Sequence, residues 1–172
     1  IMNTVDFLFE NTPSKSKIAL ITAKGAYTYQ DLLDNVSHYS NQFHSWGISV
    51  GDRIGILSCN SLFWIASYLA ILKTGATAVQ FAATLSPDQL DTYLSSINLS
   101  LLCIEERLYR RLGSVVQKVN LFRDDAKFIE AAAKPAKAAE HVDGSSDALL
   151  MFTSGTTATP RLVRITHQNL QA

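Results

Sequence analysis

Short apolar runs alternate with longer segments of helical pattern along almost the whole chain, and this alternation restricts the fold more than any other feature. Strands that alternate with helices at this spacing are typical of an α/β domain with a largely parallel sheet. We therefore expect an α/β fold in which helices flank a mostly parallel sheet. The runs expected to form strands are 18–22, 26–28, 53–60, 77–82, 99–105, 115–122 and 148–152.

Three helices have recognisable start signals. Thr28 and Asp31 resemble a capping box, in which two side chains satisfy free N–H groups at a helix start. Asn60 can cap a second helix over 61–74, and the run 86–89, with its N1 proline, marks the start of a third. The inward face expected for the first helix consists of Leu32, Leu33, Val36, Tyr39, Phe43 and Trp46.

Length and composition narrow the class of protein. The 172 residues suit one domain, or one domain and part of a second. Fifteen basic residues balance fifteen acidic ones, so the broad basic field of a non-specific nucleic-acid-binding protein is absent. No secretory signal opens the sequence, and the longest apolar run, 62–72, is shorter than the roughly 20 residues that cross a bilayer. We expect a soluble, cytoplasmic protein that has no membrane span and binds no nucleic acid.

Cysteine and histidine patterns do not indicate a metal centre. Cys59 and Cys103 lie far apart in apolar runs without CxxC or Cys/His spacing, so we expect buried, reduced thiols. A metal or redox role is the alternative. No zinc-ligand pattern is formed by the four histidines, His38, His44, His141 and His167. We assign no metal ligand to this chain.

A hydroxyl-rich segment, residues 153–157, follows the last apolar run at 148–152. That run follows a connection at about 131–147, which we expect on the surface. A tight turn around a glycine can direct successive backbone N–H groups at a phosphate, and neutral hydroxyls add further donors. A positive charge past the turn could also meet the anion. The candidate phosphate-binding residues are Thr153, Ser154, Gly155, Thr156, Thr157 and Arg161.

The alternative for this segment is a polar turn whose Ser and Thr side chains bind their own backbone. The patterns of several better-known sites are missing from the sequence. It has no GxxxxGK[ST] P-loop, no GxGxxG after an early strand, and no GxSxG around a nucleophilic serine. The segment therefore indicates either a phosphate site of another kind or a simple turn.

The stretch TSGTTATPRLV at 153–163, followed by ITHQN at 165–169, resembles the phosphate-loop motif of the adenylate-forming superfamily. That superfamily includes acyl-CoA synthetases, the adenylation domains of nonribosomal peptide synthetases, and luciferase. The resemblance covers nearly the whole chain and implies that residues 1–172 are the N-terminal part of an AMP-binding domain. Earlier motifs of the superfamily are resembled, in order and spacing, by TYQDL at 28–32, GDRIGIL at 51–57, KTGA at 73–76 and LSP at 85–87.

By this resemblance the hydroxyl-rich residues wrap the β- and γ-phosphates of ATP. Three positions depart from the motif: Ala158 and Leu162 replace glycines, and Arg161 replaces a lysine. Arg161 keeps the positive charge but presents a planar fork in place of a point charge. Thr166 is expected to cap a helix that opens with His167, for which ordinary packing is one reading and a site contact the other.

The resemblance also implies an ATP-dependent carboxylic acid:thiol ligase. Such an enzyme activates a carboxylate as an acyl-adenylate with release of pyrophosphate, and then transfers the acyl group to a thiol. The implied cofactors are ATP, Mg²⁺, and CoA or phosphopantetheine as the thiol. The implied partners are a carboxylic acid and, where phosphopantetheine is the thiol, an acyl carrier protein. The superfamily's Mg²⁺ ligand, ribose-binding aspartate and catalytic lysine belong to later segments. We therefore assign no catalytic residue to this chain, and expect it to be inactive without the C-terminal part of the same enzyme.

Two alternatives to the ligase remain open. The chain could be a catalytically degenerate binding or scaffold module with the same fold, which the substitutions at 158, 161 and 162 favour. It could also be an unrelated α/β domain whose loop is only a turn. In that case residues 153–157 need not follow a strand of the sheet.

Overall fold

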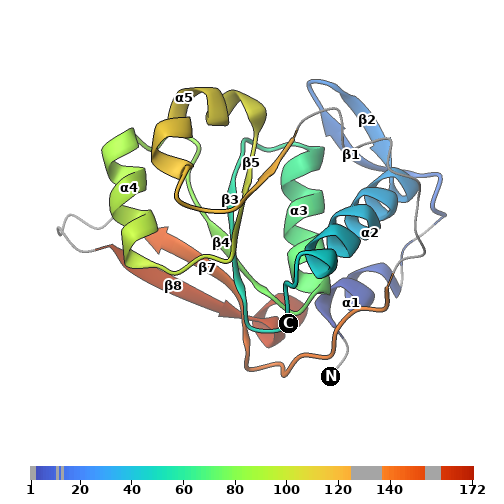
Figure 1. Ribbon diagram of the computed structural model, residues 1–172. Coiled ribbons are helices and arrows are strands. Elements are labelled where there is room, and N and C mark those ends of the chain that lie inside the picture. The colour runs from blue at the N-terminus through green and yellow to red at the C-terminus, as the bar shows by residue number, and fades with distance from the viewer. Residues whose placement is uncertain (1–2, 11, 13, 125–136, 154–159) are drawn as a thin grey trace.

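The computed structural model describes residues 3–10, 12, 14–124, 137–153 and 160–172. Over these residues it contains a six-stranded sheet with helices on both faces and a separate two-stranded hairpin (Figure 1). The helices are α1 (Thr4–Glu10), α2 (Tyr29–Ser45), α3 (Leu62–Lys73), α4 (Pro87–Ser96), α5 (Glu106–Val116) and α6 (His167–Gln171). The strands are β1 (Ile18–Thr22), β2 (Gly25–Thr28), β3 (Arg53–Leu57), β4 (Thr77–Gln80), β5 (Leu101–Ile104), β6 (Leu121–Arg123), β7 (Asp147–Thr153) and β8 (Arg161–Thr166).

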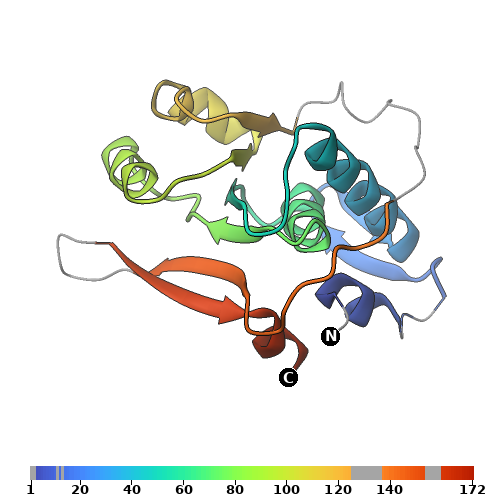
Figure 2. The ribbon, with the colours of Figure 1, turned by 60° about the horizontal axis from the view of Figure 1, so that its bottom comes forward.

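The six-stranded sheet is parallel except at one edge. Its strand order is β6-β5-β3-β4-β7-β8, and only β8 runs antiparallel to its neighbour. Parallel strands need crossover connections, which place helices on both faces of the sheet. Helices α1, α2 and α3 pack on one face, and α4 and α5 pack on the other (Figure 2). The expected α/β fold, with a mostly parallel sheet flanked by helices, is confirmed.

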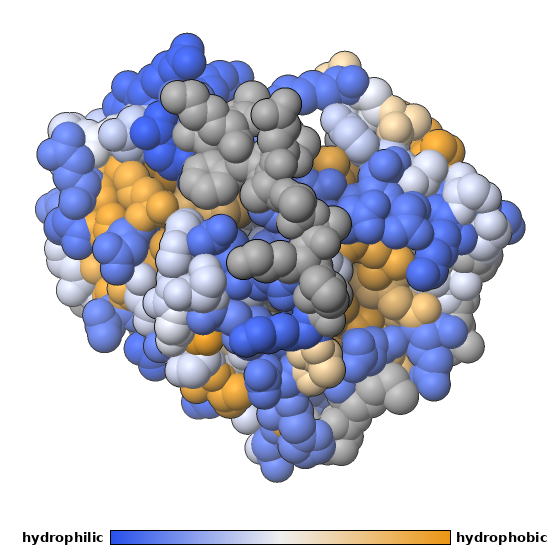
Figure 3. Space-filling model, turned by 45° about the vertical axis from the view of Figure 1, so that its right-hand side comes forward, coloured by the Kyte–Doolittle hydropathy of each residue, from blue (hydrophilic) through white to orange (hydrophobic). Residues whose placement is uncertain are grey.

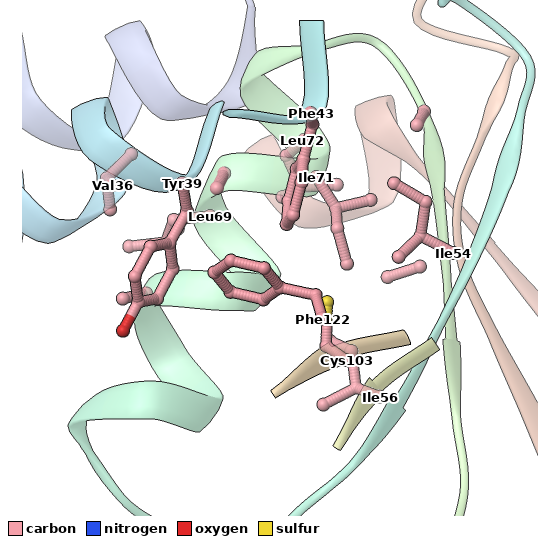
Figure 4. Packing of buried hydrophobic residues seen from close by; sticks show 14 of the residues in the cluster. Val36, Tyr39, Phe43, Ile54, Ile56, Leu69, Ile71, Leu72, Cys103 and Phe122 are labelled. Atoms are coloured by element: carbon pink, nitrogen blue, oxygen red, sulfur yellow. The ribbon is translucent and has the colours of Figure 1, made fainter. Parts of the chain in front are cut away.

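Aromatic rings fill the core between the sheet and α2. Phe122 in β6 contacts Tyr39, Phe43 and Phe63, with ring centroids 4.8, 5.2 and 5.8 Å away. Figure 4 shows the Phe122 ring pointing between Tyr39 and Phe43. Edge-to-face contacts such as the first two add to the free energy gained by burial. They attach the short edge strand β6 to the helical layer.

The start signals of α2 and α4 are confirmed. Thr28 and Asp31 form a capping box at the start of α2, and Ser86 and Gln89 form one at the start of α4. Four members of the expected inward face of α2 are buried, whereas Leu33 is half-buried and Trp46, at the C-cap, is exposed.

Two local predictions are wrong. Ser61 rather than Asn60 caps α3, because Ser61 has the extended backbone that brings its hydroxyl to the N–H three residues later, at 3.1 Å. The strand predicted at 115–122 is the end of α5 followed by the shorter β6. Val116 lies one helical repeat after Leu112 and is buried with it, so burial along the helix overrides the strand preference of a β-branched residue.

A strand follows the hydroxyl-rich segment at a place where the sequence did not predict one. β8 pairs with β7 from Asp147 opposite Thr166 to Thr153 opposite Arg161. The hydroxyl-rich segment therefore does follow a strand of the sheet. This placement removes the support for the unrelated domain in which the loop is only a turn.

Residues 137–146, which precede β7, form neither helix nor strand. Residues 131–136 of the expected connection lie outside the described parts of the chain. Val142 is buried, and the Glu140 N–H donates to the carbonyl of Lys73 at 2.9 Å, so this segment is tied to the end of α3.

Hydrophilic residues dominate the face of the molecule seen in Figure 3, and hydrophobic residues lie in separate areas among them. Among the helices that the structure describes, none combines the length and the hydrophobicity that a membrane span requires.

Candidate functional site

Thr153 and Arg161, which lie at the two ends of the motif, are at the ends of β7 and β8 that face each other. β7 extends the parallel sheet because its residues 149–151 pair in register with residues 78–80 of β4. The motif begins where β7 ends, which is the edge of the sheet from which the parallel strands lead into their connections. Ligands of open α/β sheets bind outside these carboxyl ends.

Two of the six predicted phosphate-binding residues are described, and they face each other. Thr153, the last residue of β7, is the register partner of Arg161, the first residue of β8. The Thr153 hydroxyl donates to the carbonyl oxygen of Arg161 at 3.4 Å. Both ends of the motif therefore meet, and their role in phosphate binding stays a prediction. The other four residues, Ser154, Gly155, Thr156 and Thr157, lie outside the described residues.

The two arginines of β8 have different surroundings. Arg164 pairs with Asp147 of β7, with Nε 2.9 Å from Oδ1 and 3.2 Å from Oδ2. Arg161 is exposed and forms no ion pair with a carboxylate in the parts of the chain that the structure describes. A guanidinium stays charged at every physiological pH. Arg161 therefore presents a positive charge to any anion at the end of the hairpin.

Apolar side chains share the face of the hairpin that carries Thr153 and Arg161. Side chains alternate between the two faces along a strand, so Met151 and its register partner Val163 lie on this face. Their exposed fractions are 37% and 46%. The end of the hairpin can thus contact a ligand that carries both anionic and apolar groups.

Aromatic stacking supports the opposite face of β7. Phe152 stacks on Tyr93 of α4, with centroids 4.4 Å apart, and lies 5.5 Å from Phe81. Leu162 is the register partner of Phe152 and is partly exposed, at 39%. Its position in an extended strand requires no positive φ, so the bulk that replaces the motif's glycine is accommodated. Ala158 lies outside the described residues.

Helix α6 closes the base of the hairpin. Thr166 and Asn169 form a capping box at its start, as expected for Thr166. His167 is fully buried, and its Nδ1 lies 2.8 Å from the hydroxyl oxygen of Thr4. Burial lowers the pKa of His167, which favours the neutral ring. These contacts agree with the packing reading of His167.

The two cysteines differ in their surroundings. Cys103 is fully buried, and burial raises the pKa of its thiol. Cys59 is only half-buried, and its Sγ accepts a hydrogen bond from Nη2 of Arg107 at 3.1 Å. Burial was therefore predicted correctly for Cys103 and wrongly for Cys59, which follows the end of β3 and leaves the apolar layer.

The described residues contain no group of three or more His, Cys, Asp or Glu side chains that could hold a metal ion. We assign no Mg²⁺ ligand among them.

Three contacts around the site had no signal in the sequence. Their partners are far apart in the chain, and no local spacing relates them. The β-branched residues Val163, Ile165 and Thr166 could have indicated β8 itself, but not these partners. The three contacts are Arg164 with Asp147, Phe152 with Tyr93, and His167 with Thr4.

Comparison with known proteins finds relatives along most of the chain. A family model described as AMP-binding enzyme matches residues 9–172. A nonribosomal peptide synthetase of Gibberella zeae is 30% identical over 158 residues, which are 91% of this chain and 2% of that protein. The mitochondrial malonate–CoA ligase of Mus musculus is 28% identical over 166 residues, which are 91% of this chain and 28% of that protein. The chain thus spans less than a third of each of these relatives.

A solved structure shares the fold. Apo MatB from Rhodopseudomonas palustris matches with a TM-score of 0.83 and 20% identity, covering 97% of this chain and 35% of that protein. At this level of identity the likeness speaks for the fold alone.

Proposed function

The chain belongs to the AMP-binding enzyme family of adenylate-forming ligases, and we propose that it is the N-terminal, phosphate-binding part of an ATP-dependent carboxylic acid:thiol ligase. The proposed reaction has two steps. A carboxylate oxygen attacks the α-phosphorus of ATP, which gives an acyl-adenylate and releases pyrophosphate. A thiol of CoA, or of a carrier-protein phosphopantetheine arm, then attacks the acyl carbon and displaces AMP.

The observation that carries the proposal is the meeting of Thr153 and Arg161 at the carboxyl end of the sheet. Each lies at one end of the motif that resembles a phosphate loop. Arg161 is exposed and has no carboxylate partner among the described residues, so its fork can bind phosphate oxygens with two parallel hydrogen bonds. Positioning and neutralisation of charge supply most of the catalysis in phosphoryl chemistry.

The remaining parts of the reaction are proposed for other segments of the enzyme. The chain corresponds to 2% and 28% of the two relatives above. We propose that Mg²⁺ accompanies ATP as its complex, and that the acid and the thiol bind mainly outside this chain. The isolated 172-residue chain should therefore form no acyl-adenylate. Acyl-adenylate produced by that purified chain would contradict this division of the enzyme.

Carboxylate-dependent exchange of pyrophosphate into ATP tests the proposal on the full-length gene product. A panel of fatty, aryl and amino acids should give exchange with one class, because only a bound acid of the right shape completes the first step. Omission of the acid is the control, since exchange must depend on it. A folded protein that gives no exchange with any acid would contradict the ligase.

A negative exchange result would favour the alternative, a catalytically degenerate binding or scaffold module with the same fold. The departures from the motif at Ala158, Arg161 and Leu162 motivate this alternative. Binding of MgATP without exchange would then identify a binding module, and a stop codon directly after Ala172 would support a module of this length.

A further inference from the structure

A buried contact joins α1 to the end of β8. The hydroxyl oxygen of Thr4 lies 2.8 Å from Nδ1 of His167, and Nε2 of Gln171 donates to the same oxygen at 3.1 Å. Thr4 is 1% exposed and His167 is fully buried. α1 and α6 lie side by side in both ribbon views (Figures 1 and 2). The proposed reaction makes no direct use of this contact.

The donors and acceptors of this contact define its chemistry. Gln171 donates to Thr4 Oγ1, which leaves the hydroxyl hydrogen of Thr4 to point at Nδ1 of His167. His167 then accepts as a neutral ring. In this tautomer its Nε2 carries the ring hydrogen and has no hydrogen-bond partner in the described parts of the chain. A charged ring would bury that same N–H and a cation in addition. The contact is therefore a neutral hydrogen bond from Thr4 to His167.

Asn3 fixes α1 to the body of the molecule. Its Nδ2 donates to the carbonyl oxygens of Leu72 and Glu140, at 2.9 and 2.8 Å, and its Oδ1 accepts from the N–H of Val5 at 2.9 Å. Leu72 belongs to α3, the helix that covers the sheet. Thr4, next in the chain, is thus a fixed point from which His167 can be held.

β8 needs such a fixed point because it is an edge strand. Within the described chain its only strand partner is β7. Arg161 lies five residues from Thr166, a distance of about 17 Å at the rise of a strand. A tilt of about 5° at the base would move Arg161 by about 1.5 Å, and a misplacement of about 1 Å can lower a catalytic rate by roughly 100-fold.

We propose that Thr4 and His167 are positioning residues whose hydrogen bond fixes the base of β8 to α1 and thereby places Arg161 at the far end of the strand. The ligand that Arg161 meets, ATP, rests on the proposed function. The mechanical link between Thr4 and β8 does not depend on it.

Three substitutions separate this link from general loss of stability. Thr4→Val removes the hydroxyl and keeps the shape of the side chain, whereas Thr4→Ser keeps the hydroxyl. Thr74→Val is the matched control, because Thr74 is also fully buried and donates only to Ile71 of the preceding helical turn, at 2.8 Å. Thr4→Val loses the bonds to His167 and from Gln171, and Thr74→Val loses the bond to Ile71, but only Thr4→Val releases β8.

Hydrogen–deuterium exchange on the full-length gene product without nucleotide is the first measurement. Thr4→Val should accelerate exchange in peptides from 147–153 and 160–171 and leave those of α4 and α5 unchanged. Thr4→Ser should behave as the wild type, and Thr74→Val should not affect the hairpin selectively. Unchanged exchange in the hairpin of Thr4→Val, or equal acceleration throughout the protein, would overturn the proposal.

The KM for MgATP in the exchange reaction is the second measurement. Thr4→Val should raise it by about two- to ten-fold, the factor that corresponds to one net hydrogen bond, and leave the KM for the acid unchanged. An unchanged KM for MgATP would overturn the link to Arg161. If the wild type gives no exchange with any acid, the proposed function fails, and hydrogen–deuterium exchange still decides the positioning role.

Discussion

Arg164 holds Asp147 across the base of the β7–β8 hairpin, with its Nε within 2.9 and 3.2 Å of the two carboxylate oxygens. An exposed ion pair of this kind contributes only about 0–1 kcal/mol to stability. Its main effect is to occupy the charge of Arg164. Arg161, three residues earlier, has its charge available at the other end of the same strand. The two arginines therefore form a matched pair for substitution.

Arg161→Gln in the full-length enzyme should raise the KM for MgATP by roughly ten-fold, because it removes a charge-assisted hydrogen bond to phosphate. Arg161→Lys should lose less, since it keeps the charge. Arg164→Gln should leave this KM unchanged and cost at most about 1 kcal/mol of stability. Pyrophosphate exchange at varied ATP concentration measures the difference. Equal effects of Arg161→Gln and Arg164→Gln would argue against a phosphate contact by Arg161.

Gly75→Ala should destabilise the protein more than Gly47→Ala. Both glycines have positive φ, +71° and +82°, so either alanine costs about 1–2 kcal/mol of backbone strain. A Cβ at Gly75 would also lie 2.8 Å from Cγ2 of Val50, whereas a Cβ at Gly47 meets nothing within 4 Å. The overlap should add about 1–3 kcal/mol. Urea unfolding of both variants measures the decrease in the free energy of unfolding. Equal decreases would show that the side chains around Gly75 move aside without an energetic penalty.

The two thiols should react at different rates with an aromatic disulfide reagent. Cys59 is half-buried and should react in the native state, whereas Cys103 is fully buried and its raised pKa keeps it protonated. Native protein should therefore release one equivalent of the chromophore from this chain, and denatured protein two. Cys59→Ser should abolish the native reaction. Rapid native labelling of Cys103 would contradict its burial.

His167 should make stability depend on pH on the acid side of neutrality. Burial lowers its pKa below the ordinary 6.5, so the unfolded chain takes up a proton before the folded one. The contribution is complete above about pH 6.5 and is lost as the pH falls. Unfolding free energies measured from about pH 7.5 to about pH 5 should fall less steeply in His167→Asn than in the wild type.

His44 adds to the pH dependence of stability. Some slope should persist in His167→Asn, because burial and, to a smaller extent, Lys137 lower the pKa of His44. Identical slopes in His167→Asn and the wild type would show that His167 does not titrate with folding.

Local signals were sufficient for much of the fold. The two residues of each capping box, such as Thr28 with Asp31, lie three positions apart and act through their own helix start. The sequence therefore predicted α2 and α4 independently of the rest of the molecule. The alternation of strands and helices predicted the sheet for the same reason, because the spacing of apolar residues within each segment indicates its type of secondary structure.

Contacts between residues far apart in the sequence determine the features of the fold and the site that the sequence predicted wrongly or missed. Val116 is buried with Leu112 in the hydrophobic cluster that also contains residues of α4. The sequence of the segment alone does not indicate this packing. The partners of β8 and of His167 also come from elsewhere in the chain. The motif thus indicated which residues could bind phosphate, whereas the meeting of Thr153 and Arg161 required the hairpin.

The bond between Thr4 and His167 spans 163 positions of the chain, and this separation sets an order of events during synthesis. At about 5–20 residues per second, roughly 8–33 s pass on the ribosome between the two residues. α1 has seven residues, fewer than the roughly 12–15 that an isolated helix needs, so it cannot persist by itself in that interval. Arg161 is translated before His167, but its strand is secured only after His167 has emerged. On a nascent chain, the surface proposed to meet the nucleotide is therefore among the last parts of residues 1–172 to mature.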